Sequence, residues 1–241
     1  TTDQLNAMEQ ADFEKLTTSQ VAAFKADQVG GLSTTQLSRL STAQVNALSG
    51  AHISRLSTDS VKSLSSAQVA AINVTALRSL TADQINALDT ADLAVMGTAQ
   101  VAGLRSDQLQ GMTTTQLNVL TTTQVSSLST SQIQAMGSAQ FQALSGSQLS
   151  ALSSSQLAAI DTADLASMSN TQIAGLTTTF VQAMTTAQVA GLSTAQVQAL
   201  GNAQLNALTS TQVQALETTD VAALSSTQVA GLASASVTAL T

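Results

Sequence analysis

The sequence has no cysteine, tryptophan, tyrosine or proline, and it holds a single histidine, His52. Without cysteine the chain has neither a disulfide framework nor a thiol nucleophile, and one histidine is too few for a zinc site. A Ser-His-Asp triad would have to use His52, and no catalytic motif surrounds that residue. We therefore predict no enzymatic activity, no cofactor, and no catalytic, cofactor-binding or metal-binding residues.

Charged residues are also scarce, because Asp, Glu, Lys and Arg make up 9% of the chain and the formal net charge is −7. A negative chain without a basic stripe lacks the electrostatic driving force for binding phosphates, so we predict no nucleic-acid partner. Long apolar runs are missing too. Gln, Ser or Thr interrupts every apolar stretch well before the ~18 residues that a membrane-spanning helix needs, so we predict no membrane span.

A pattern of eight residues, here called the octad, runs from one end of the chain to the other. When the last residue of each octad falls on a multiple of eight, position eight is Leu, Ile, Met or Phe from Met8 to Leu240. Position five is apolar from Leu5 to Val237. Position four is Gln in 21 octads and Asp in 4. Such a fixed period is typical of a repeat protein.

The spacing within one octad favours a helix. Positions five and eight lie about 60° apart around a helix, whereas residues three apart in a strand point to opposite faces. Ser or Thr at position one is a good N-cap, and Gln three residues later completes a capping box, as in Ser41 and Gln44. Leu40 and Val45 flank this pair as a hydrophobic staple. Each octad therefore predicts one helix of about two turns.

One octad is too small to fold alone. Burial of its two large apolar side chains contributes roughly 3–6 kcal/mol, whereas ordering eight residues costs on the order of 8–16 kcal/mol. Stacking on neighbouring octads must supply the difference. We predict an all-α solenoid of very short helices, one per octad, that forms a single continuous domain over residues 1–241. The pattern is unbroken at both ends, so we expect a segment of a longer array.

The alternative architecture is a β-solenoid, in which Gln and Thr stack in ladders between coils. The content of Thr, Ser, Val and Gln allows it, while the capping-box spacing favours the helices. The number of octads in one superhelical turn does not follow from the pattern.

Acidic residues occur as pairs at positions one and four of three octads. The pairs are Asp89 and Asp92, Asp161 and Asp164, and Glu217 and Asp220. Calcium takes six to eight oxygen ligands, and two carboxylates are too few to supply them. Acids at these positions would cap a helix and interact favourably with its dipole, so we expect capping rather than metal binding.

Three sites depart from the Gln or Asp pattern in ways that bear on function. His52 stands at position four, and we expect it to replace Gln on the surface. Phe180 also stands there, either as a contact point for a neighbouring molecule or as a tolerated substitution. The octad 73–80 is the least regular, with Val74 and Ala76 at usually polar positions. It predicts a local kink, or it is drift in the repeat.

The phrase Leu-Ser/Thr-x-x-Gln-Val-x-Ala-Leu recurs along the whole chain. It resembles the short arrays of very large repetitive bacterial secreted or surface proteins, often described as adhesin-like or as exoproteins. The resemblance implies an extracellular or cell-surface location and a structural or adhesive role, and it brings no residue-level site.

We therefore predict a non-enzymatic structural repeat protein that forms an extracellular stalk or a self-assembling filament. Self-association would be head-to-tail or lateral, because open solenoid ends can stack and a weakly charged surface repels little. The alternative is an adhesive module that binds ice or a glycan through its Ser, Thr and Gln surface, since Thr fills position two in half of the octads.

Overall fold

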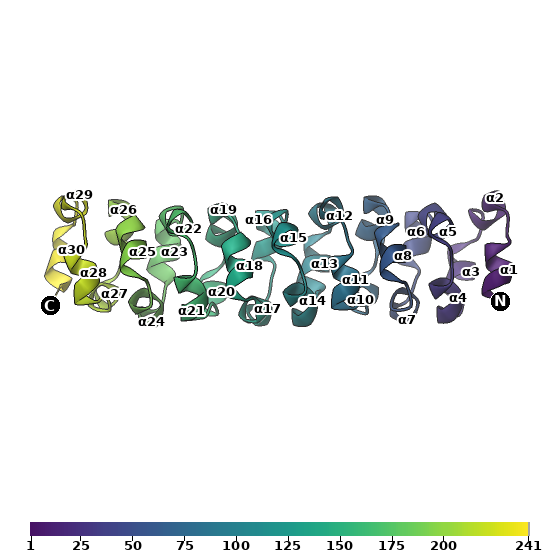
Figure 1. Ribbon diagram of the computed structural model, residues 1–241, viewed down its shortest axis with the longest axis horizontal. Helices are drawn as coiled ribbons and strands as arrows, with labels where there is room; N and C mark the ends of the chain where they lie inside the picture. Colours follow the sequence, from purple (N-terminus) through teal and green to yellow (C-terminus); the bar gives the residue numbers. More distant parts are fainter. Residues whose placement is uncertain (241) are drawn as a thin grey trace. The chain divides into compact units, whose positions relative to one another are not determined.

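The computed structural model describes residues 1–240, and each octad in that range contains one helix (Figure 1). The helices have four to six residues, and residues 1–240 contain no strand. The all-α prediction is confirmed, and the β-solenoid alternative is wrong. The helices are shorter than the two turns expected because both ends of an octad are extended. Ser65 has φ −74° and ψ 157°, and Ile72 has φ −61° and ψ 124°.

The chain divides into two compact units, residues 1–127 and the residues from Leu128 onward. The first unit contains α1 (Thr2–Asn6), α2 (Gln10–Phe13), α3 (Thr18–Ala22), α4 (Ala26–Gly30), α5 (Thr34–Arg39), α6 (Thr42–Asn46), α7 (Gly50–Ile53), α8 (Thr58–Lys62), α9 (Ser66–Ala71), α10 (Val74–Leu77), α11 (Ala82–Asn86), α12 (Thr90–Val95), α13 (Thr98–Gly103), α14 (Ser106–Gln110), α15 (Thr114–Asn118) and α16 (Thr122–Ser126).

The second unit contains α17 (Thr130–Ala135), α18 (Ser138–Ala143), α19 (Gly146–Ser150), α20 (Ser154–Ala158), α21 (Thr162–Ala166), α22 (Asn170–Ala174), α23 (Thr178–Ala183), α24 (Thr186–Ala190), α25 (Thr194–Ala199), α26 (Asn202–Leu205), α27 (Ser210–Gln214), α28 (Thr218–Ala222), α29 (Ser226–Ala230) and α30 (Ser234–Ala239). The prediction of one continuous solenoid over residues 1–241 depends on how the two units join, and it stays a prediction.

Within each unit a helix packs against the third helix before it and the third helix after it. In the first unit α3 contacts α6, α6 contacts α9, and α9 contacts α12. In the second unit α18 contacts α21, α21 contacts α24, and α24 contacts α27. Three octads therefore make one coil of 24 residues, and the stacked coils give each unit three columns of helices. None of the helices in residues 1–240 has the length and apolarity needed to cross a membrane.

The apolar positions five and eight form the core between the three columns. Leu37 and Leu77 in the first unit and Leu149 in the second are fully buried. The capping device is present as predicted. Oε1 of Gln44 accepts the N–H of Ser41 at 2.7 Å, and the Ser41 hydroxyl accepts the N–H of Gln44 at 3.2 Å.

Small residues at position seven let adjacent coils approach closely. Position seven of one octad faces position two of the third octad before it, so a Cβ added to Gly111 would lie 2.7 Å from the Cβ of Ala82. The bulky Val74 at position two is matched by Gly103 at position seven, where a Cβ would overlap a methyl of Val74.

This match explains why the kink considered for residues 73–80 is absent. The octad forms the ordinary helix α10, whose cap Asn73 has φ −67° and ψ 151°. The Asn73 side chain accepts the N–H of Ala76 at 2.9 Å, and Ala76 itself is fully buried. The irregular residues are therefore compensated within the repeat.

Candidate functional site

The most regular polar feature of both units is a series of buried glutamines at position four, here called the glutamine ladder. In α9, Oε1 of Gln68 accepts the N–H of Ser65 at 2.8 Å and so caps its own helix. Its Nε2 donates to the carbonyls of Leu37 and Leu40, at 2.8 and 2.7 Å, in the preceding coil. One side chain therefore begins a helix and also joins two coils.

The second unit repeats this arrangement. Nε2 of Gln188 donates to the carbonyls of Leu157 and Ile160 at 2.8 and 2.9 Å, which lie 31 and 28 residues earlier in the chain. Oε1 of Gln188 accepts the N–H of Thr185 at 2.9 Å. Because the amide is 2% exposed, these bonds are shielded from water.

Sequence reasoning found the capping bond of the ladder and missed the bond between coils. The signal was available in the composition of position four. Glu and Gln both complete a capping box, yet Glu never occurs at position four in thirty octads. Only the amide carries N–H donors that can satisfy a buried carbonyl. The exclusion of Glu therefore indicates a second, donating role.

His52 is a member of the ladder. Its Nδ1 accepts the N–H of Ser49 at 3.2 Å, and its Nε2 lies 2.8 Å from the carbonyl oxygen of Phe24. A backbone N–H can only donate and a carbonyl can only accept, so the ring is neutral with its proton on Nε2. The expected replacement of Gln is correct. The expected surface position is wrong, because the ladder is internal and His52 is 6% exposed.

Where aspartate replaces glutamine in the ladder, the side chain accepts the hydrogen bond between coils instead of donating it. Asp92 in α12 is 4% exposed, and its Oδ2 accepts the N–H of Asp89 at 3.1 Å. A carboxylate has no proton to donate to a carbonyl. Instead, Oδ1 of Asp92 accepts the hydroxyl of Ser66, 26 residues earlier, at 2.7 Å.

The position-four acids of the other two pairs make the same contact between coils. Asp164 accepts the hydroxyl of Ser138 at 2.6 Å, and Asp220 accepts the hydroxyl of Thr194 at 2.8 Å. The N–H of Glu217 is 3.3 Å from the Asp220 carboxylate. All three position-four acids therefore make coil contacts, and Asp92 and Asp220 also accept a cap N–H, whereas α21 has no capping box. Within residues 1–240, no three His, Cys, Asp or Glu side chains gather in a way that could hold a metal ion.

Phe180 occupies a ladder position in α23 and is 4% exposed. The hypothesis that it is a contact point for a neighbouring molecule is wrong, because the ring lies inside the coil. The hydroxyl of Thr177 still accepts the N–H of Phe180 at 3.2 Å, so the helix begins normally. Helix α23 tolerates this substitution, but it lacks the amide donor that Gln provides at position four.

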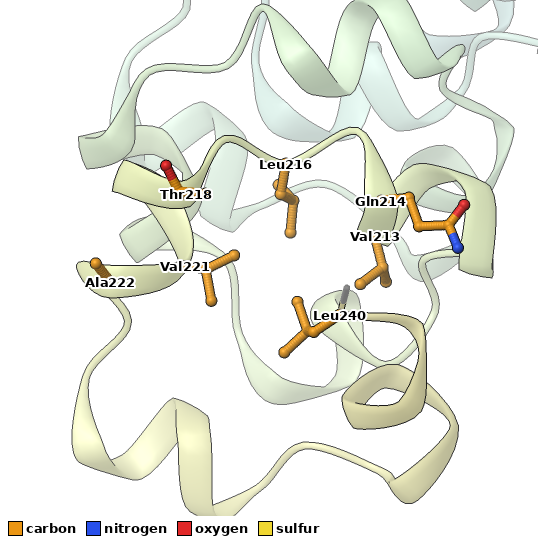
Figure 2. A pocket seen from close by; sticks show the side chains of 7 residues that line it. All are labelled: Val213, Gln214, Leu216, Thr218, Val221, Ala222 and Leu240. Atoms are coloured by element: carbon orange, nitrogen blue, oxygen red, sulfur yellow. The ribbon is translucent and has the colours of Figure 1, made fainter.

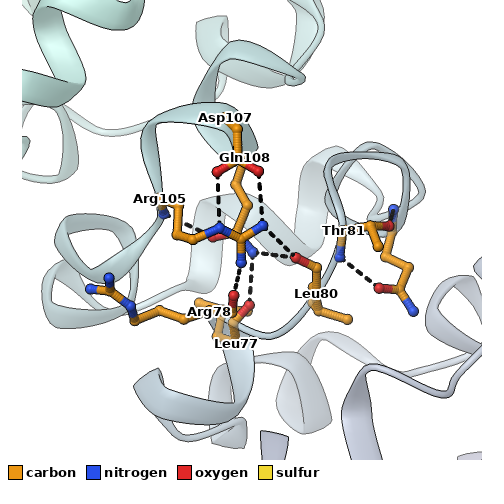
Figure 3. A network of polar contacts seen from close by, with 8 residues as sticks. Leu77, Arg78, Leu80, Thr81, Arg105, Asp107 and Gln108 are labelled. Carbon is orange, nitrogen blue, oxygen red and sulfur yellow. Dashed lines mark hydrogen bonds and ion pairs between the residues drawn. The ribbon is translucent and has the colours of Figure 1, made fainter. Parts of the chain in front are cut away.

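A charged cluster at the start of α14 joins two coils of the first unit (Figure 3). The guanidinium of Arg105 lies 2.9 Å from the carboxylate of Asp107, and it donates to the carbonyls of Arg78 and Leu80. The hydrogen bond from Arg105 lowers the pKa of the Asp107 carboxyl. Arg105 thus adds bonds between coils beside those of Gln108, whose Nε2 donates to the Leu80 carbonyl at 2.7 Å.

A hollow of about 400 Å³ lies in the last coil of the second unit (Figure 2). The residues lining it are Val213, Gln214, Leu216, Thr218, Val221, Ala222 and Leu240. Leu216, Val221 and Leu240 are half-buried, whereas most residues at positions five and eight of inner coils are buried. The lining carries no titratable group, so the hollow has the chemistry of an apolar core rather than of a reaction site.

The octads match the ALTTAQ repeat over residues 5–42, 27–58, 85–122, 116–146, 157–194 and 189–218, which together cover more than half of the chain. The chain belongs to the ALTTAQ repeat family. No curated protein matches it. Family membership and the ladder both indicate a repeat protein in which each octad has the same structural role.

One column of ALTTAQ octads in each unit presents Ser or Thr at every position two, and we call it the hydroxyl column. Its members are Thr18, Thr42, Ser66, Thr90 and Thr114 in the first unit, and Ser138, Thr162, Thr186, Ser210 and Ser234 in the second. Position two of the other columns also holds Gly, Ala, Val, Gln or Asn. Seven of the ten hydroxyl residues are exposed, so this column presents a row of Ser and Thr side chains at the surface of each unit.

Proposed function

We propose that this ALTTAQ chain is a non-enzymatic structural protein that forms an extracellular stalk or a self-assembling filament. The observation that carries the proposal is the glutamine ladder. Nearly every internal polar side chain, such as Gln68 or Gln188, makes a cap and a bond to the preceding coil. A chain built in this way grows in length by adding equal coils, which is how solenoids produce extended structures.

The surface supports the same role. Charged residues are 9% of the chain, and the residues after Arg105 include no basic side chain. Weak mutual repulsion lets copies approach one another end to end or side by side. The extracellular location rests on the resemblance to secreted repetitive proteins, and the absence of cysteine is compatible with an oxidising environment.

Electron cryo-microscopy of the purified chain over a range of concentrations tests this proposal. We expect uniform thin fibres whose length increases with concentration, and an axial repeat that corresponds to one 24-residue coil. Dispersed single particles at every concentration would contradict the filament and leave only the stalk.

The hydroxyl column favours a second candidate, an adhesive module that binds ice or a glycan. A regular row of hydroxyls can order water or accept sugar hydroxyls without needing charge. The test is ice-recrystallisation inhibition and glycan binding by the isolated monomer. Thr114→Lys, in the hydroxyl column, would abolish either activity, whereas Thr58→Lys in another column would retain it. Equal loss in both variants, or no activity in the parent, would reject this candidate.

A further inference from the structure

The coils of each unit are connected in series. In the second unit α20 packs against α17 and α23, and α23 packs against α26. A load that stretches the unit must therefore pass through every contact between coils in turn, and the weakest contact opens first. The polar part of such a contact is the hydrogen bond from a position-four side chain to the preceding coil. A position where the ladder lacks this bond, here called a gap, therefore marks a weak contact.

Three inner octads have no glutamine, aspartate or histidine at position four. Between Gln36 and Gln228 these residues are Ser60, Ala76 and Phe180. Methyl and phenyl side chains have no donor. The Ser60 hydroxyl accepts the hydroxyl of Ser57 at 2.9 Å, and it donates to no carbonyl of the described residues. All three positions are therefore candidates for a gap.

A neighbouring side chain fills the position left by Ala76. Nδ2 of Asn73, the cap of the same helix, donates to the carbonyls of Asn46 and Leu48, each at 3.0 Å. Leu48 lies 28 residues before Ala76, so its carbonyl is the one that a glutamine at position four would reach. Asn73 thus supplies the missing donor, and this contact between coils keeps its polar bonds.

No side chain fills the gap at Phe180. The corresponding carbonyl belongs to Leu152, which is buried, and no donor in residues 1–240 reaches it. The cap N–H of Thr177 donates instead to the hydroxyl of Ser150 in the preceding coil, at 3.3 Å and in an exposed position. This contact therefore keeps one long, exposed bond, where Gln188 makes two buried ones.

The first unit has a gap of the same kind at Ser60. The carbonyl that a glutamine there would reach is that of Leu32, which is buried and accepts no hydrogen bond from the described residues. A buried carbonyl without a partner makes its contact between coils weaker than one in which both partners are present. Each unit therefore contains one inner contact that is weaker than its neighbours.

We propose that the protein is an extensible, load-bearing chain whose units open first at the gaps of Ser60 and Phe180. The proposal rests on the stalk of the proposed function and adds a mechanical activity to it. After a gap opens, further coils detach one at a time, because each coil is held only by its neighbours. One detached coil of 24 residues supplies up to about 80 Å of extended chain.

Reclosing follows from the same local contacts. The acceptors of Gln188 lie 28 and 31 residues earlier, so a detached coil re-forms by closing a loop of short and constant length. The chain has neither proline nor cysteine, so neither proline isomerisation nor disulfide exchange slows this step. The extension is therefore reversible, and the chain yields to a load and recovers its length afterwards.

A swap of two residues tests the role of the gap. Phe180→Gln supplies the missing donor, and Gln124→Phe creates a new gap in the first unit, where Gln124 donates to the carbonyl of Met96 at 2.7 Å. Both positions follow three threonines, and the hydroxyls of Thr121 and Thr177 cap their helices in the same way. The swap variant carries both changes and keeps the composition of the parent.

Hydrogen exchange followed by mass spectrometry on the full chain locates the opening without load. We expect residues 177–184 of the parent to exchange faster than residues 185–192, whose ladder contact is complete. Phe180→Gln should slow exchange at residues 177–184 at least 10-fold. The swap variant should show this protection and also exchange at least 10-fold faster at residues 121–128. Phe180→Gln alone keeps the test valid if Gln124→Phe impairs folding.

Optical tweezers measure the response to load. Because the chain has no cysteine, Thr130→Cys and Thr218→Cys, at two exposed residues, give unique attachment points on either side of Phe180. We expect the parent to lengthen reversibly in steps of one coil, and Phe180→Gln to open at least 10-fold more slowly at the same load. The control Thr179→Gln adds an amide at an exposed residue outside the ladder and should leave the rate unchanged.

The outcomes separate this proposal from the proposed function. If Phe180→Gln exchanges and opens as fast as the parent, the gaps are not the weak contacts and the proposal is overturned while the stalk stands. If the second unit lengthens in a single step, extension by one coil at a time is wrong. If the parent lengthens like an unfolded chain from the lowest load, it bears no load, and the stalk is rejected as well.

Discussion

The two units are built with the same kind of core and the same glutamine ladder but differ in charge. The first unit holds all seven basic residues and ten of the acidic ones, whereas the second holds four acidic residues. In the first unit, Arg39 lies 3.5 Å from Glu14 and Arg55 lies 3.4 Å from Asp27, and each pair joins adjacent coils. The second unit builds the same three columns with no basic residue at all. The fold of this repeat therefore depends on the core and the ladder, and ion pairs make only a secondary contribution.

Substitutions in the core should cause the largest losses of stability. These losses should be similar in the two units. Leu77 and Leu149 hold position five in the first and second units, and both are fully buried. Leu77→Asp and Leu149→Asp should each destabilise the surrounding coils by about 4 kcal/mol or more, because a charge enters the core unpaired. Hydrogen exchange followed by mass spectrometry on the full chain measures the local loss. An effect confined to one unit would break the equivalence of the two cores.

Removing one glutamine of the ladder should cause the second-largest loss of stability. Gln68→Ala leaves the Leu40 carbonyl and the Ser65 N–H without a partner, and Gln188→Ala does the same to the Ile160 carbonyl and the Thr185 N–H, at a cost of about 2–4 kcal/mol each. Gln20→Ala is the matched control, because Gln20 is exposed, and it should cost about 1 kcal/mol or less. Urea denaturation with local hydrogen exchange reports the three values. Equal losses at Gln20 and Gln68 would mean that capping alone accounts for the ladder.

Alanine substitutions of two glycines at position seven should change stability differently, because the neighbours of the two glycines differ. A Cβ on Gly111 would lie 2.7 Å from the Ala82 Cβ, whereas one on Gly191 would lie 3.4 Å from the Thr162 Cβ. Gly111→Ala should destabilise the first unit by about 1–2 kcal/mol through overpacking. Gly191→Ala should be neutral, or stabilise the second unit by about 0.5 kcal/mol, because alanine restricts the unfolded chain. Thermal unfolding of the two variants checks the difference in sign.

Electrostatic changes should be smallest and confined to the first unit. The lowered pKa of Asp107 means that its pairing with Arg105 stabilises the fold above the unfolded pKa and is lost as the pH falls through the folded value. Because the pair is exposed, the effect should stay below about 1 kcal/mol. Comparison of the parent with Arg105→Ala between pH 5 and pH 3 measures it. A similar acid response at residues 129–160, which contain no acidic residue, would show that charge is not its source.

The sequence predicted the contacts within one octad well, and it predicted fewer of the contacts between octads. The capping box of Ser41 and Gln44 and the buried columns follow from spacing that a single octad contains. The three-octad coil does not, because it depends on how octads stack. The same gap explains His52 and Phe180, which look like surface substitutions until a preceding coil covers position four. The exclusion of Glu from that position was the one sequence clue to the missing contact.

The direction of the ladder bears on how the protein is made. The buried glutamines donate to carbonyls that precede them by 28 or 31 residues, and Gln188 donates to both, Ile160 and Leu157. During synthesis, an octad that leaves the ribosome therefore finds its acceptors already present. The loop closed by each new rung has the same length however long the array becomes, so its entropic cost stays constant. Such a chain can fold progressively from its first residues, at a pace independent of its total length.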